Sequence, residues 1–94
     1  MKGHDLISRE AIAIARSVAA LALAAESRHR LLAASLLGAS EELASNATLQ
    51  SADRLRAVLQ AARSAGVVPA VAYGIACVRL DLVEEELEGL RRAA

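Results

Sequence analysis

The sequence has few aromatic side chains. Its 94 residues include no Phe, no Trp and a single Tyr, although 55% of them are hydrophobic. Ala and Leu supply much of this fraction, and Ala, the best helix former, buries little area when it is packed. A core of Ala and Leu lets helices approach closely but gains little free energy from each side chain. We therefore expect a helical domain whose core is extended by a second copy of the chain.

Cysteine and net charge are also scarce. The single cysteine, Cys77, excludes a disulfide within the chain and favours a reducing, cytoplasmic setting. The 11 basic and 11 acidic residues cancel, which argues against the basic face of a nucleic-acid-binding protein and against a polybasic membrane anchor. No uncharged stretch reaches the roughly 20 residues that a membrane-spanning helix needs. We expect neither nucleic acid nor a membrane among the partners.

The first half of the chain contains no proline, and its residues favour a helix. We predict one long first helix over about 6–43, which Gly38 weakens or kinks. The alternative is that the polar segment 26–30 forms a turn and breaks this helix near Ser27.

Clear boundary signals follow. Asn46 and Thr48 are both good N-caps for a second helix over 49–65, which carries one apolar stripe at helical spacing. Gly66 is placed to end this helix as a left-handed C-cap, and Pro69 is suited to the first turn of the next.

The third helix is predicted over 69–92. The alternation typical of strands is absent. The chain is therefore expected to form a single all-α domain over 1–94: a bundle of three helices, or of four if the first breaks near Ser27, completed by homo-oligomerisation.

Two segments are apolar on every side of a helix. Ala11–Ala25, AIAIARSVAALALAA, contains only Arg16 and Ser17 as polar residues, and the segment from Pro69 to Val78 is similar. A helix that is apolar all round must be covered all round. We expect the two segments to pack on each other and their uncovered sides to contact a partner chain, so the favoured assembly is a homodimer.

Arg16 and Arg79 are the charges that interrupt these apolar regions. An arginine buried among Ala and Leu needs a carboxylate or another anion beside it, because an unpaired buried charge is very costly. Each is interpreted either as an ion-pair partner between helices or subunits, or as part of a site for an anionic ligand.

Cysteine and histidine lack the neighbouring residues that a catalytic or metal site requires. Cys77 has no His one helical turn away, and His4 and His29 are isolated. No spacing of His, Cys and acidic residues is typical of a metal site, and no catalytic triad or phosphate-binding loop is present. We predict no catalytic residue, no metal and no cofactor.

The order of long helix, short helix, Gly-x-x-Pro turn and long helix resembles the small all-helical chorismate mutases. The segment AGVVPAVAYGIACVRL (65–80) is similar to that family's entry to its third helix. The resemblance implies an intertwined dimer with arginines around a dicarboxylate, in which Arg9 or Arg16 with Arg28 stand for the family's pair in the first helix. The segment TLQSADRLR (48–56) has no counterpart of the family's Arg-Glu element.

Two functions follow as hypotheses. The first is a non-catalytic α-helical oligomerisation or protein-interaction module, whose high Ala content and clean caps are also typical of a designed bundle. The alternative is a small-molecule-binding helical enzyme in which Arg16, Arg28 and Arg79 hold an anionic substrate.

Overall fold

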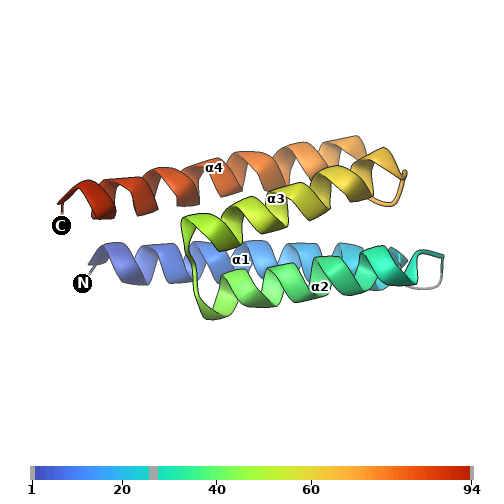
Figure 1. Ribbon diagram of the computed structural model, residues 1–94, viewed down its shortest axis with the longest axis horizontal. Coiled ribbons are helices and arrows are strands. Elements are labelled where there is room, and N and C mark those ends of the chain that lie inside the picture. Colours follow the sequence, from blue (N-terminus) through green and yellow to red (C-terminus); the bar gives the residue numbers. More distant parts are fainter. Residues whose placement is uncertain (1, 26–27, 94) are drawn as a thin grey trace.

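The computed structural model describes residues 2–25 and 28–93, with side chains from Ile7 onward. Within these residues the chain forms no strand and four helices: α1 (Lys2–Ala25), α2 (Arg30–Ser45), α3 (Leu49–Ser64) and α4 (Ala70–Ala93). Successive helices run in opposite directions, and α4 returns to lie beside α1 (Figure 1). The prediction of an all-α chain is confirmed.

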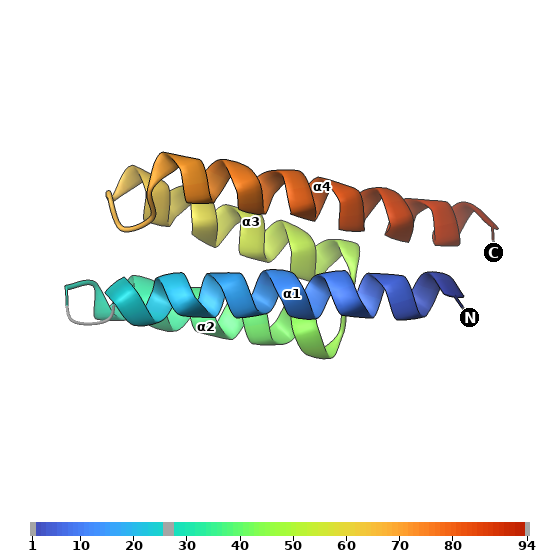
Figure 2. The same ribbon diagram turned by 180° about the vertical axis from the view of Figure 1, so that it is seen from behind.

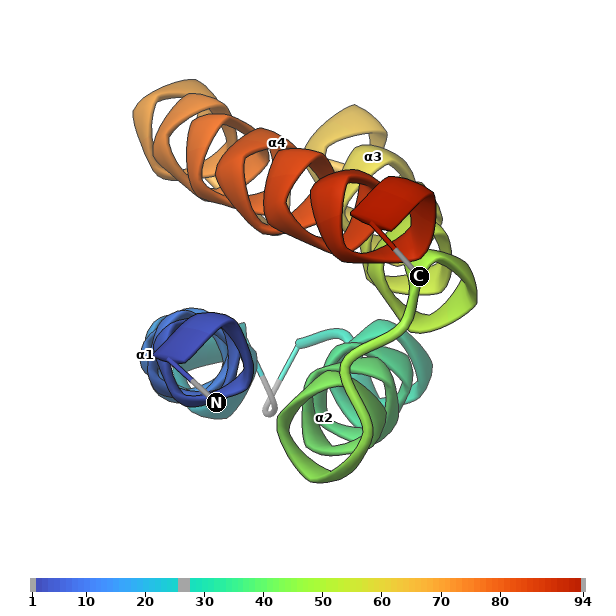
Figure 3. The same ribbon diagram turned by 90° about the vertical axis from the view of Figure 1, so that its left-hand side faces the viewer.

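The four helices form two pairs. Viewed from behind, α1 and α2 lie together on one side of the bundle, with α3 and α4 on the other (Figure 2). The end view shows that α4 slants relative to α1, which lies at its own corner of the bundle (Figure 3). Over the described residues, each helix contacts only two others: α1 does not pack on α3, and α2 does not pack on α4.

The single helix predicted over 6–43 is corrected by the structure. The first helix begins at Lys2 and ends at Ala25, whose carbonyl accepts hydrogen bonds from the backbone N–H groups of both Arg28 and His29. Ser27, where the alternative placed the break, lies outside the described residues. A helix over 6–43 would be about 57 Å long, longer than the 44 Å long axis of the molecule.

The physical reason is burial. Folding back lays the apolar stripe of α2, which includes Ala33, Leu36 and Leu43, against the stripe of α1. A straight helix would leave this stripe in water. The small Ala side chains on both helices let the two backbones pack closely.

Local signals set the boundaries of α3. The Thr48 hydroxyl accepts a hydrogen bond from the backbone N–H of Ser51 at 3.0 Å, and the Ser51 hydroxyl accepts one from Thr48 N–H at 2.9 Å. After α3, Gly66 has a φ of 76°, and Val67 N–H donates to the Ala62 carbonyl at 2.9 Å. These bonds satisfy backbone groups that a helix end leaves unpaired.

The core is a column of aliphatic side chains between the helix pairs. Its largest fully buried members are Ile14, Leu36, Leu43, Leu55, Leu59 and Leu80. The first half of α4 does pack on α1, as Ala76 and Val18 show. Coverage of Ala11–Ala25 is nevertheless one-sided, since Ile12 and Leu23 on its outer face are exposed. With only α2 and α4 as neighbours, α1 cannot be covered all round.

Candidate interaction surface

The outer face of α4 carries an exposed aliphatic stripe. Its members keep much of their surface in contact with solvent: Val71 (74%), Ile75 (58%), Val78 (60%) and Leu82 (51%). Their spacing of four, three and four residues places them within a roughly 60° arc of the helix and is the spacing of a coiled-coil seam. We call these four residues the α4 stripe.

α4 is therefore covered less than the other helices. Only three of its 24 residues are buried, Ala76, Leu80 and Val83, whereas α3 buries five of its 16. The apolar character of Pro69–Val78 was predicted from the sequence, but the stripe was not. The 4-3-4 spacing itself was the signal that could have shown it.

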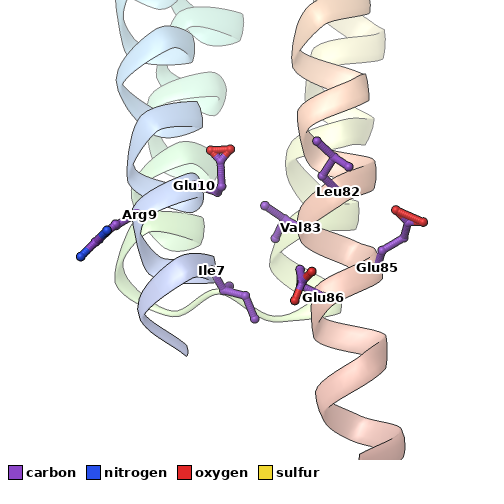
Figure 4. A pocket seen from close by; sticks show the side chains of 7 residues that line it. All are labelled: Ile7, Arg9, Glu10, Leu82, Val83, Glu85 and Glu86. Carbon is purple, nitrogen blue, oxygen red and sulfur yellow. The ribbon is translucent and has the colours of Figure 1, made fainter. Parts of the chain in front are cut away.

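A groove runs between α1 and α4 beside this stripe. It contains two hollows, of about 440 Å³ and about 220 Å³. The larger is shown in Figure 4, where Ile7 points toward α4, Val83 points toward α1, and Arg9 points away from the gap. The smaller is lined mainly by aliphatic side chains, including Val18 and Ile75.

One ion pair crosses the groove. Arg79 on α4 lines the smaller hollow, and its Nη2 lies 3.7 Å from Oε2 of Glu10, which lines the larger one. Both side chains remain 35–40% exposed. The cation in the groove is thus already opposite an acid, which reduces its attraction for an anionic ligand.

A second polar cluster joins α3 to α4. Arg56 Nη2 donates to Asp81 Oδ1 at 2.7 Å and to Glu84 Oε1 at 2.5 Å. This contact was not predicted from the sequence. Asp81 and Glu84 are one turn apart on one helix, and this spacing was the available signal.

The pKa values in this cluster are shifted. Burial lowers the pKa of Arg56, but the hydrogen bonds and charges of Glu84 and Asp81 outweigh it and leave this pKa above its ordinary value. Burial raises the pKa of the Glu84 carboxyl, and a hydrogen bond with Asp53 raises it further, while Arg56 opposes both effects. The cluster is suited to holding α3 and α4 together.

The three arginines proposed as ligand-binding residues are not gathered in one place. Arg16 is exposed and forms no ion pair with a described side chain. Arg28 lies in the turn after Ala25, and Ala25 is itself roughly 14 Å along the helix axis from Arg16. Arg79 pairs with Glu10 across the groove. The long first helix on which the resemblance to chorismate mutases depends is replaced by the α1–α2 hairpin.

The remaining candidate, Cys77, contacts another side chain of α4. Cys77 is half-buried beside Tyr73, and a hydrogen bond between them raises the pKa of the tyrosine hydroxyl. The guanidinium of Arg63 lies 5.3 Å from the centre of the Tyr73 ring, a cation–π contact. In the part of the chain that the structure describes, no three His, Cys, Asp or Glu side chains are grouped as metal ligands.

None of the helices, over the described residues, combines the length and apolar character needed to cross a membrane. Comparisons with protein-family models, with curated proteins and with solved structures find no match to this chain.

Proposed function

We propose that this chain is a non-catalytic helical oligomerisation module that forms a homodimer through the outer face of α4. The observation that carries the proposal is the α4 stripe, in which four large aliphatic side chains are more than half exposed along one line. Monomeric proteins seldom present such a contiguous apolar line to water, and exposed apolar patches mark interaction sites.

The total surface supports the same proposal. The chain has an accessible surface of 5923 Å². A folded monomer of 9.8 kDa is expected to expose roughly 5,200 Å², so the excess is about 700 Å². A standard interface buries about 800 Å² on each partner. The excess surface is therefore close to what one side of a stable dimer covers.

The polar features favour a scaffold over a catalyst. Two arginines that face another helix are already paired, Arg56 with Asp81 and Glu84, and Arg79 with Glu10. These pairs link neighbouring helices, so their guanidinium groups are less available to bind an anionic ligand. Binding of a second copy is the activity that the exposed stripe supports.

The test is the mass in solution over a wide range of chain concentrations, measured by sedimentation. A concentration-dependent dimer is expected, and a chain that stays monomeric at high micromolar concentration would refute the proposal. Ile75→Glu should weaken the dimer at least about thirty-fold, as loss of a central interface residue typically does.

Leu23→Glu is the matched control. Leu23 is 62% exposed, close to the 58% of Ile75, but it lies on α1 outside the stripe. Both variants place a charge on a solvent-exposed helix position, so both should fold. Only Ile75→Glu should change the dissociation constant, and an equal effect of the two variants would contradict a role for α4.

A further inference from the structure

We infer that two copies pair their α4 helices in antiparallel orientation, about a twofold axis that passes between Ile75 and Val78. This inference rests on the proposed function and specifies its geometry. In this register Val71 lies against the partner's Leu82, and Ile75 lies against the partner's Val78. The interface is then the same patch on both copies, which closes the assembly at two chains.

The symmetry of the stripe supports this register. Its four members are spaced four, three and four residues apart, so the pattern reads the same in both directions. The midpoint lies between Ile75 and Val78, and an antiparallel partner centred there meets an aliphatic side chain at each of the four positions. Any shift along the helix leaves at least one of the four without a counterpart.

Charge decides between antiparallel and parallel pairing. Residues 70–78 of α4 contain no charge, whereas residues 81–88 contain five acids. Continuing the seam from Leu82 by three residues reaches Glu85, which is exposed. Parallel pairing would place Glu85 beside the partner's Glu85, and like charges at facing seam positions oppose association.

Antiparallel pairing instead places the acidic half of α4 toward the partner's opposite end. Residues 70–78 of the partner's α4 carry no charge. The acids of one copy then lie beside an uncharged stretch of the other, so antiparallel pairing avoids the repulsion between like charges that parallel pairing creates. The charge pattern of α4 therefore favours a second copy in this orientation as the occupant of the stripe.

Gly74 permits the close approach that this geometry needs. It is exposed on the edge of the stripe, one turn from both Val71 and Val78, and a Cβ built on it would meet nothing within 4 Å. Packing within one chain therefore gives no reason for a glycine there. A glycine beside a helix seam lets a facing backbone come near.

Disulfide trapping tests the register. In a Cys77→Ser background, Val71→Cys and Leu82→Cys are made as separate variants, mixed, allowed to exchange subunits and oxidised. A disulfide needs Cα atoms about 4.4–6.8 Å apart. The antiparallel register brings position 71 to the partner's 82 but separates the two copies of position 82 by roughly 16 Å along the axis.

We expect a shift to the mass of a covalent dimer in the mixture, and little cross-linking in either variant alone. Cross-linking of each variant with itself would show parallel pairing, which overturns the inference and leaves the proposed function intact. A non-covalent dimer without either disulfide also overturns the inference. The proposed function then stands if Ile75→Glu, and not Leu23→Glu, still weakens the dimer, and falls with it if the two variants behave alike. A chain that stays monomeric in sedimentation overturns both. Circular dichroism of each variant verifies that the helices remain folded.

Discussion

Arg79 on α4 and Glu10 on α1 face each other across the groove, with 3.7 Å between Nη2 and Oε2. Among the described side chains this is the one ion pair between these two helices. The rest of their contact is aliphatic, through residues such as Ile14 and Ala76. The pair therefore contributes to the orientation of α4 relative to α1. Burial of aliphatic side chains supplies most of the free energy that holds the two helices together.

A double-mutant cycle with Arg79→Ala and Glu10→Ala should give a coupling free energy of about 0.2–1 kcal/mol, because partly exposed ion pairs contribute little. Urea unfolding of the four proteins measures it, and the coupling should weaken as salt is added. A coupling well above this range that salt does not change would contradict our description of the groove.

Arg56→Ala should destabilise the chain by about 1–2 kcal/mol, since it removes two charge-assisted hydrogen bonds and leaves Asp81 and Glu84 without their cation. Arg54→Ala is the control on the same helix, because its contact with Glu42 is 3.7 Å long and Arg54 is 69% exposed. The control should change the free energy of unfolding by less than about 0.5 kcal/mol. Equal effects would argue against the α3–α4 cluster.

The raised pKa of Glu84 predicts a pH dependence of stability. An acid whose pKa is higher in the folded state binds its proton more tightly there. Its contribution to the free energy of unfolding therefore falls as pH rises from the ordinary value of 4.5 through the folded-state pKa. Glu84→Gln removes this titration, so the free energy of unfolding of the variant minus that of the parent should rise with pH across this window. Urea unfolding at a series of pH values measures the difference, and a falling difference would contradict the prediction.

Thr48→Ala should cost about 1 kcal/mol, because it removes the side chain that caps α3. Thr48→Ser keeps the hydroxyl and should restore most of the stability. Thermal unfolding followed by circular dichroism compares the two. If both substitutions cost the same, the methyl group, and not the hydrogen bond, would be what matters at this position.

Two glycines should respond in opposite directions to alanine. Gly66 has a φ of 76°, which costs a side chain roughly 1–2 kcal/mol, so Gly66→Ala should destabilise the chain. Gly38 lies within α2 with nothing within 4 Å of a built Cβ, so Gly38→Ala should stabilise it by about 0.5–1 kcal/mol. Urea unfolding gives both values, and destabilisation by Gly38→Ala would show that this surface is covered in solution.

Much of the helical pattern could be read from sequence because the signals are local. Thr48 and Ser51 satisfy each other across a single helical turn, and Gly66 adopts its φ because of the bonds that end α3. Such interactions depend on neighbours a few residues away, so their residue types are informative on their own. One helix over 6–43 was predicted in preference to a break near Ser27, because residues 26–30 carry no strong stop signal.

The candidate site could be predicted less well, because burial depends on which helices are neighbours. Arg16 sits among Ala and Leu in the sequence, yet it is exposed, since neither α2 nor α4 covers that side of α1. The exposed fraction of each aliphatic side chain of α4 could not be derived from the sequence either. Val71 and Leu80 are both aliphatic residues of one helix, but Val71 is 74% exposed and Leu80 is fully buried.

By itself, the sequence determined that this protein is helical and where α3 begins and ends. It also showed that basic and acidic residues cancel and that no spacing of residues typical of a metal site is present. Composition, capping groups and the apolar period act over a few residues and need no tertiary context. Only the tertiary structure decided that the chain reverses between α1 and α2, that Arg79 meets Glu10, and that the stripe of exposed aliphatic side chains runs along α4. These depend on the packing of segments distant in sequence, because a side chain is buried or exposed only relative to its neighbours.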